Sequence, residues 1–211
     1  MSDVSDSPKS AVTDARASDW ERKRREILAA AAEVFFERGF ERGTTKEIAE
    51  RVGLSQPSIY HYVGNKQSLM AEIANQVSTD FTVTLDAAVA SSDDPVEQLR
   101  AIIHSFAEAL ALNVKTFAVY WKELGSIPEE TATPVAASQR SYVARVDAVV
   151  AACQRQGALP ARQPTHVLAE GILGMLSWMH WWFKPDGRMT ADQVAQAFCE
   201  LIGLPAPEST A

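Results

Sequence analysis

The chain has 211 residues, of which 46% are hydrophobic and 22% charged, a balance typical of a globular protein that buries a substantial core. It contains no run of 18 apolar residues and begins with a polar, acidic segment. We therefore expect no membrane span and no signal peptide, and a cytoplasmic location. Cys153 and Cys199 are too few for a disulfide framework or a zinc site, so we expect both to be small core residues.

The net charge of −7 is distributed unevenly along the chain. Residues 1–70 contain 11 Lys or Arg and 11 Asp or Glu, so the negative excess lies entirely after them. A basic cluster occupies residues 22–25. A mildly basic front and an acidic back favour nucleic-acid binding by the front alone. An ordinary solvated surface explains the same asymmetry equally well.

The first elements form a compact front unit over residues 19–65. Residues 1–18 lack apolar periodicity and are rich in Ser, Asp and Ala, which predicts a disordered tail. Apolar residues recur at helical spacing from Ile27 to Phe35, which predicts a first helix that starts near residue 19 and ends at Gly39.

Two short helices joined by a tight turn at Gly53 are expected next. Thr44, followed three residues later by Glu47, is a capping-box pattern for the first of them. Ser55 is a suitable N-cap for the second, and Pro57 fits its first turn, where a missing N–H costs nothing. The predicted core of the front unit is Ile27, Val34, Phe35, Ile48, Ala49, Leu54 and Ile59.

From Lys66 the pattern changes to long helices with few breakers. Pro95, Pro128 and Pro164 fall where helices are expected to begin, and no strand pattern or internal repeat is present. The fold class is therefore all-α, with a helical bundle over 66–205 and a tail at 206–211. The expected helices lie near 66–90, 95–112, 114–125, 129–156, 165–183 and 190–203.

The second short helix is a poor core element, because polar and aromatic side chains crowd residues 56–62. A helix-turn-helix unit needs a bracing helix, a turn with a small residue and a helix that can enter the major groove of DNA. Gln56 can pair with an adenine edge, while Pro57 and the Cβ of Ser58 can pack on a thymine methyl. Side chains suited to phosphate contacts are those of Thr44, Thr45, Tyr60, His61 and Lys66.

The segment from Ile27 to Leu69 resembles the DNA-binding domain of the tetracycline-repressor (TetR) family of bacterial one-component regulators. The matching stretches are 30–35, 39–40, 44–49, 53–55, 59–63 and 65–66, and residues 56–58 are similar to the reading helix of the founding repressor. Val63 and Gly64 depart from the usual pattern. The resemblance implies DNA contacts at Thr45, Lys46, Gln56, Pro57, Ser58, Tyr60, His61 and Lys66. The helix N-termini at Thr44 and Ser55 complete the predicted set, because backbone N–H groups there can bind phosphate.

The resemblance also implies a homodimer formed by the last two long helices. The chain supports this independently, because residues 167–183 contain almost no charge and nearly every face of that helix must be covered. Gly171 and Gly174 permit close helix approach; the alternative is a core within one chain. The predicted interface residues are Leu168, Ile172, Met175, Leu176, Trp182 and Phe198.

A small-molecule site in the helical bundle is implied by the same resemblance. Large soft side chains with sparse polar groups suit a hydrophobic ligand, although they can equally form only core. Residues 178–187 resemble a subgroup associated with acyl-CoA effectors. The predicted ligand-binding residues are His104, Phe106, Phe117, Tyr120, Trp121, Tyr142, Arg145, Met175, Trp178 and Met179.

The predicted function is a ligand-responsive DNA-binding transcriptional regulator. We expect a repressor released from a palindromic double-stranded operator by a small hydrophobic or acyl-CoA-type effector, with no membrane partner. No cofactor or metal is expected, since the four His residues show no ligand spacing. No enzyme activity is expected, since nucleophile elbows, phosphate loops and suitably spaced carboxylate pairs are missing. The alternative is a DNA-binding adaptor or architectural protein without an effector, and activation in place of repression remains open.

Overall fold

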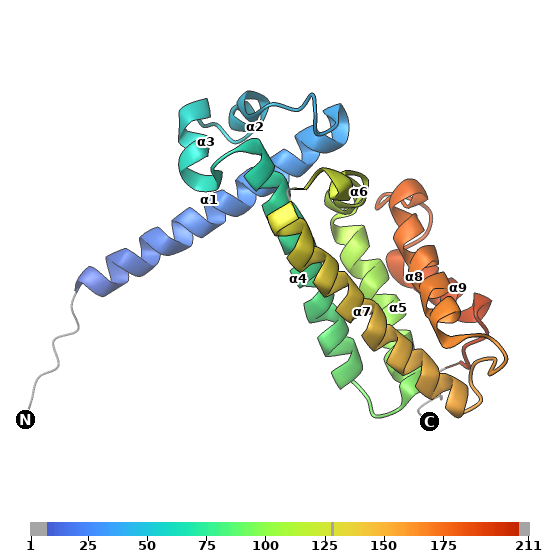
Figure 1. Cartoon of the computed structure of the whole chain (residues 1–211). Coiled ribbons are helices and arrows are strands. Elements are labelled where there is room, and N and C mark those ends of the chain that lie inside the picture. The colour runs from blue at the N-terminus through green and yellow to red at the C-terminus, as the bar shows by residue number, and fades with distance from the viewer. Residues whose placement is uncertain (1–7, 128, 207–211) are drawn as a thin grey trace, which may run out of the picture. The chain divides into compact units, whose positions relative to one another are not determined.

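The computed structural model describes residues 8–127 and 129–206, and within these ranges the backbone forms nine α-helices, one short 3-10 helix and no strand (Figure 1). The all-α fold class predicted from the sequence is confirmed. The chain divides into two compact units, residues 1–73 and residues 74–211.

The first unit contains α1 (Pro8–Arg38), α2 (Thr45–Arg51), α3 (Gln56–Val63) and the first turns of α4 (Lys66–Ala90). Helix α1 begins well before residue 19, so the disordered tail predicted for residues 8–18 is replaced by helix; residues 1–7 lie outside the described part. A helix without an apolar stripe gives no periodic signal, yet this segment is rich in Ala, has no Gly and begins with Pro at the first helical position.

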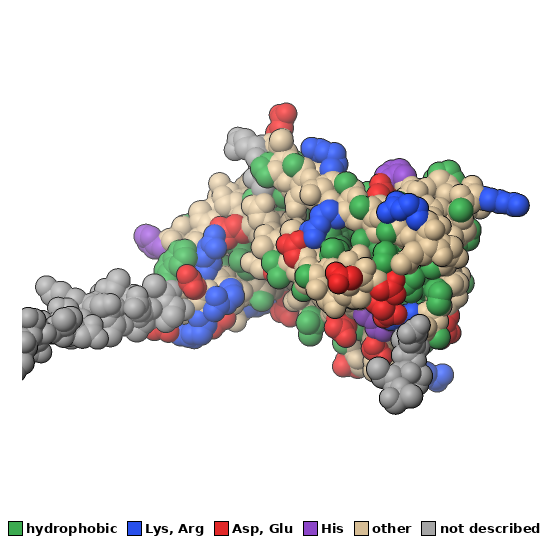
Figure 2. All heavy atoms as spheres, turned by 90° about the horizontal axis from the view of Figure 1, so that it is seen from below, with side chains coloured by type: hydrophobic (Ala, Val, Ile, Leu, Met, Phe, Trp, Pro, Cys, Tyr) green, Lys and Arg blue, Asp and Glu red, His purple; other side chains and the backbone are tan. Residues whose placement is uncertain are grey.

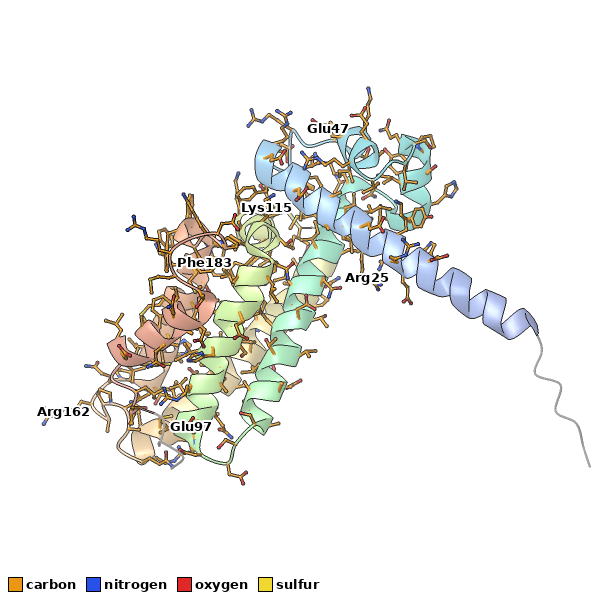
Figure 3. All side chains as sticks on the ribbon, turned by 180° about the vertical axis from the view of Figure 1, so that it is seen from behind. Arg25, Glu47, Glu97, Lys115, Arg162 and Phe183 are labelled. Carbon is orange, nitrogen blue, oxygen red and sulfur yellow. The ribbon has the colours of Figure 1, made fainter. Side chains whose placement is uncertain are left out.

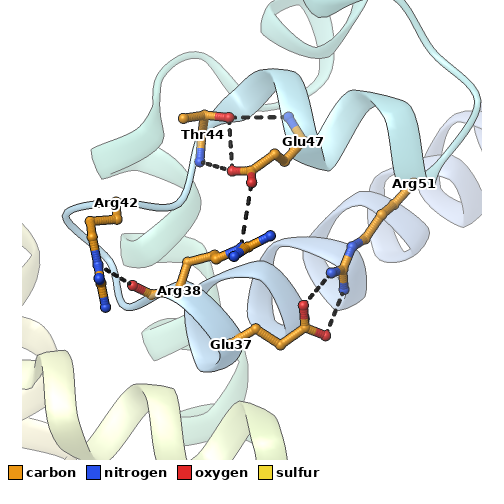
Figure 4. Close-up of polar contacts among 6 residues, drawn as sticks. All are labelled: Glu37, Arg38, Arg42, Thr44, Glu47 and Arg51. Carbon is orange, nitrogen blue, oxygen red and sulfur yellow. Dashed lines mark hydrogen bonds and ion pairs between the residues drawn. The ribbon is translucent and has the colours of Figure 1, made fainter.

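Both short helices begin at the predicted caps. The Thr44 hydroxyl accepts a hydrogen bond from the backbone N of Glu47 at 3.2 Å, and the Glu47 carboxylate accepts one from the backbone N of Thr44 at 3.0 Å (Figure 4). The hydrogen bonds from Thr44 lower the pKa of Glu47 below its ordinary value. Ser55 caps α3 by accepting from the backbone N of Ser58. The turn needs Gly53 because its φ is +67°, a conformation that side chains disfavour.

The core of the first unit lies where α1, α2 and α3 meet. Six of the seven predicted core residues are buried, and Leu54 is half-buried. The Phe40 ring folds back onto that of Phe35, with 5.2 Å between centroids. The first turns of α4 join this core through Leu69 and Ile73. The unit therefore ends further along the chain than the predicted boundary after residue 65.

The second unit is a helical bundle arranged around α5. It contains the rest of α4 with α5 (Pro95–Leu112), α6 (Val114–Glu123), α7 (Glu129–Arg155), α8 (Thr165–Trp182) and α9 (Ala191–Leu201). Helix α5 packs against α6, α7, α8 and α9. The predicted spans are closely matched, except that a 3-10 turn (Leu124–Ser126) replaces the end of the helix expected over 114–125. Figure 3 shows Glu97 and Arg162 at one end of this bundle and Lys115 and Phe183 at the other.

Taken singly, none of the described helices has both the length and the apolar composition to cross a membrane. Helices α5 and α6 together meet those two criteria, but they bend by 95° at the break between them. Within the described residues, no group of three or more His, Cys, Asp or Glu is placed to hold a metal ion.

Candidate nucleic-acid interface and ligand cavity

The exposed face of α3 is polar and aromatic. Gln56, Pro57, Tyr60 and His61 are exposed, while Ile59 between them is fully buried. The exposed residues form two adjacent pairs one helical turn apart, so they share one side of the helix. This side offers amide, phenol and imidazole groups to a partner while the other side holds the helix in the core.

Thr45, predicted to contact phosphate, is buried with 7% of its surface exposed. Its Oγ1 accepts a hydrogen bond from Gln56 Nε2 at 3.1 Å and lies 3.1 Å from Tyr60 Oη. The side chain therefore faces α3 and not solvent, which differs from its predicted role. The reason is packing, because α3 lies against the first turn of α2 and covers the Thr45 hydroxyl.

Lys66 and Ser58 are also engaged inside the first unit. The Lys66 ammonium donates to the carbonyl of Glu41 at 2.9 Å and lies 4.6 Å from the centroid of the Phe40 ring. The Ser58 hydroxyl lies 2.7 Å from that of Ser55, the N-cap. Lys66 fixes the start of α4, and two of its three donor hydrogens remain for another partner.

Lys46, a lysine predicted to contact DNA, lies on the surface and not in the core. It is exposed, and its ammonium lies 4.0 Å from the Glu50 carboxylate. The basic cluster at 22–25 is mostly paired with acids, although Arg25 is exposed. Figure 2 likewise shows basic and acidic side chains interspersed on the visible face. The pairs within the cluster are Arg22 with Asp19, Lys23 with Glu26, and Arg24 with Glu72.

A cavity of about 580 Å³ lies in the second unit between α4, α5, α6, α7 and α8. Phe117 is at the centre of its aromatic wall, 5.3 Å from the Phe81 ring and stacked on Trp121 at 6.2 Å. This size and lining suit a small organic ligand. The predicted residues that line the cavity are Phe106, Phe117, Tyr120, Trp121, Tyr142 and Trp178.

Neutral polar groups lie among the aromatic residues of this wall. Tyr120 Oη accepts a hydrogen bond from Gln139 Nε2 at 2.7 Å. Burial raises the pKa of Tyr120 to about 12 and also raises the pKa of Tyr142. Both phenols therefore stay protonated near neutral pH. Among the described residues, the lining contains no Lys or Arg, and Glu170 is its one carboxylate.

Four predicted ligand residues lie outside the cavity lining. His104 Nδ1 is 2.8 Å from an Asp192 carboxylate oxygen on α9, and Arg145 forms an ion pair with Asp86 on α4. Each polar side chain thus faces a partner on a neighbouring helix, which the sequence does not reveal. The other two are Met175 and Met179, which lie on the opposite side of α8 from the lining residues Gly174 and Ser177.

His180 lines the cavity but is absent from the predicted set. Its Nδ1 lies 2.6 Å from the Ser177 carbonyl oxygen, so in the neutral ring Nδ1–H donates and Nε2 remains an acceptor. Its ring lies 5.9 Å from that of Phe117. The helical spacing from Glu170 through Ser177 to His180 is the signal that could have identified this side of α8. Further missed lining residues are Val77, Ser78, Phe81, Thr82, Ser138, Gln139, Val143, Glu170, Leu173, Gly174 and Ser177.

Helix α8 also has an exposed apolar face. Val167, Trp178 and Trp181 are 61%, 59% and 69% exposed. Between them, Gly171 and Gly174 have no atom within 4 Å of where a Cβ would lie. The predicted interface residues Leu168, Met175, Trp182 and Phe198 are half-buried or exposed.

Two predicted interface residues are not available to a partner. Ile172 and Leu176 are 3% and 0% exposed, because they fill the core between α8 and the rest of its own bundle. Their assignment to the interface is therefore wrong. The uncovered face of α8 lies on another side of the same helix.

Comparison with known proteins identifies the family. Residues 27–73 match the family described as "Bacterial regulatory proteins, tetR family", and residues 92–203 match "Tetracyclin repressor-like, C-terminal domain". The second match alone spans more than half of the chain, so the chain belongs to the tetR family of bacterial regulatory proteins. The first match includes the start of α4, and the second begins after α4 ends.

Relatives of the whole chain are transcriptional regulators. The chain is 27% identical over 191 residues to the HTH-type transcriptional repressor KstR2 of Rhodococcus jostii, covering 89% of this chain and 93% of that protein. It is 23% identical over 176 residues to the HTH-type transcriptional activator FasR of Mycolicibacterium smegmatis, covering 82% and 78%. A solved structure of AibR in complex with isovaleryl coenzyme A and operator DNA is similar with a TM-score of 0.77 and 28% identity, covering 87% of this chain and all of that one.

Proposed function

We propose that this protein is a homodimeric repressor that binds a palindromic operator and is released by a small apolar effector or by the acyl part of an acyl-CoA. The observation that carries the proposal is the presence, in one chain, of an exposed polar α3 face and a separate aromatic cavity. The repressor KstR2, similar over most of the chain, favours repression over activation.

The DNA contact is assigned to the exposed side of α3. Gln56 and Pro57 read base edges in the major groove, and Tyr60 binds a phosphate. His61 lies on the same face, and Lys46 on α2 adds electrostatic attraction. Thr44 and Ser55 contribute through the helix N-termini that they cap.

The effector is assigned to the cavity. Because the described lining residues include no Lys or Arg, the cavity favours a neutral apolar group, and the phosphates of a CoA thioester stay outside it. Protonated Tyr142 and the Nε2 of His180 are the polar groups that meet a carbonyl or hydroxyl of the ligand. The complex of AibR with isovaleryl coenzyme A, a relative of similar fold, supports the acyl-CoA class.

The dimer is assigned to the exposed face of α8. Exposed apolar side chains on both sides of Gly171 and Gly174 form a stripe on which a second copy of α8 can approach closely. A two-fold dimer presents two copies of α3 to the half-sites of a palindrome. Glu170, Gly174 and Trp178 are exposed and also line the cavity, so the dimer face adjoins the cavity mouth.

Operator binding and its release test the proposal together. Duplex DNA from the region upstream of the chain's own gene is titrated with the full-length protein at fixed salt, followed by fluorescence anisotropy. Acyl-CoA thioesters of increasing chain length are then added, with free coenzyme A as the control for the phosphates. We expect saturable binding of a palindromic site and release by a thioester but not by free coenzyme A. Binding that no thioester or neutral apolar metabolite weakens favours the adaptor reading and overturns the effector assignment.

A further inference from the structure

Thr45 is the buried member of a three-residue hydrogen-bond chain between α2 and α3. Its Oγ1 lies 3.1 Å from both Gln56 Nε2 and Tyr60 Oη. Thr45 is 7% exposed, whereas Tyr60 is 47% exposed and Gln56 is also exposed. A hidden hydroxyl therefore joins two side chains of the surface to which DNA binding is assigned.

With Gln56 Nε2 facing Thr45 Oγ1, as in this structure, one order of donors satisfies every group in the chain. The Gln56 amide N–H donates to Thr45 Oγ1, the Thr45 O–H donates to Tyr60 Oη, and the Tyr60 O–H points outward. In the reverse order Tyr60 donates to Thr45, whose own hydrogen then needs a further acceptor. Within the described residues Thr45 Oγ1 has no hydrogen bond to any other atom, so the reverse order leaves a buried donor unpaired.

This order presents complementary groups to DNA. The outward Tyr60 O–H is a donor, which a phosphate oxygen accepts. Gln56 keeps its Oε1 acceptor and its second amide N–H. These two groups match the N6 donor and N7 acceptor that adenine shows in the major groove.

We propose that Thr45 is a positioning residue that fixes the amide of Gln56 for adenine and couples this contact to the phosphate contact of Tyr60. The inference rests on the proposed function, because it concerns how the same surface reads its operator. A free glutamine side chain turns its amide either way round, whereas the bond from Gln56 Nε2 to Thr45 Oγ1 holds the amide with Oε1 turned away from Thr45 before DNA arrives. A DNA phosphate that accepts a hydrogen bond from Tyr60 then polarises the three-residue hydrogen-bond chain and strengthens each bond in it.

The test is the base preference of the full-length protein. Duplexes are selected from a random-sequence double-stranded library by the wild type and by Q56A, T45V, T45S and Y60F. The selected duplexes are aligned so that each base-pair position forms one column. Loss of base preference in one symmetric pair of columns with Q56A identifies the base that Gln56 reads. Valine keeps the shape of Thr45 but removes its hydroxyl, and serine keeps the hydroxyl. T84V is the matched control, because the Thr84 hydroxyl, among the described residues, bonds only to the Phe81 carbonyl of its own helix.

We expect T45V to lower the adenine preference at the Gln56 columns at least fivefold while the other columns persist. T45S restores the preference, and T84V leaves the whole profile unchanged. A T45V profile equal to that of the wild type overturns the inference, and so does equal weakening of all columns. If T45V does not fold, as measured by circular dichroism, Y60F decides: selective weakening of the Gln56 columns supports the coupling, and a base-preference profile equal to that of the wild type overturns it. A wild-type protein that selects no motif overturns the proposed function itself, an outcome distinct from the others.

Discussion

Lys46 and Gln56 are both exposed on the first unit, but they offer different chemistry to DNA. Lys46 carries a charge on a flexible side chain, and its ammonium lies 4.0 Å from the Glu50 carboxylate. Gln56 is neutral, and its amide is fixed by a hydrogen bond to Thr45. A flexible charge suits a phosphate, and a fixed amide suits a base edge.

The two residues should therefore fail in different ways when replaced by alanine. K46A should weaken binding to all duplexes alike and reduce the salt dependence of log K by about 0.9 for each Lys46 engaged. Q56A should cost about 1–3 kcal/mol on the operator and relax the preference at one base pair of each half-site. Anisotropy titrations at several salt concentrations, on the operator and on a scrambled duplex, measure both effects. Equal losses on both duplexes for Q56A would contradict its assignment to a base.

For single residues, side-chain exposure was predictable where the residue type and its position in the helix both favour the surface. Polar side chains follow one another on α3, so Gln56 and Tyr60 had to reach the surface. Thr45 is polar as well, and nothing in its type or its place beside a helix N-cap indicates that α3 covers it. Its burial depends on how α2 packs against α3, which is a tertiary property.

Helix α8 has two apolar sides. One side fills the bundle core through Ile172, Leu176 and Met179, and another side exposes Val167 and Trp181. The nearly uncharged sequence predicts that every side is covered, but it cannot tell which side is covered by the same chain. That ambiguity explains why the predicted interface mixed core residues with surface residues.

Charged substitutions on the two sides of α8 should have different consequences: one should break the dimer, and the other should destabilise the fold. V167E combined with W181E should give a folded monomer, because both side chains are exposed in the single chain and the proposed partner covers them. L176E should instead lower the free energy of unfolding by more than about 3 kcal/mol, because it buries an unpaired charge. Light scattering and thermal unfolding separate the two outcomes.

A matched control for this experiment is V83E on α4, where the valine is 60% exposed. It should leave the oligomeric state unchanged. A double variant V167E and W181E that remains dimeric would refute α8 as the interface.

For the whole molecule, the helix spans were predictable because proline and glycine mark the ends of long apolar patterns. The aromatic wall of the cavity was partly predictable, since Phe106, Phe117 and Trp121 are large residues on helices that the resemblance places in the ligand unit. The polar members were not, because His104 and Arg145 are paired with acids on other helices. Which polar side chains face a cavity is decided by such pairings across the bundle, and these are invisible in one sequence.

Helix α4 is a continuous element that begins in the first unit and ends in the second. Its early residue Leu69 is buried in the core of the first unit, and its later residue Phe81 lines the cavity. An effector that binds two states of the cavity with different affinity therefore acts on a helix that also belongs to the DNA-binding unit. Such coupling must be reciprocal for the two binding free energies.

The effector should weaken operator binding by the same factor by which the operator weakens effector binding, typically between about 5-fold and 150-fold. S138F places a large side chain into the cavity, so it should raise the effector concentration needed for release while leaving operator affinity unchanged without effector. A137F is the matched control, because Ala137 is the exposed neighbour on α7 and does not line the cavity. Anisotropy for DNA and calorimetry for effector, each with and without the other ligand, close the cycle. Release of DNA that is equally sensitive to effector in S138F and A137F would move the effector site away from this cavity, whereas a selective loss in S138F ties the signal to it.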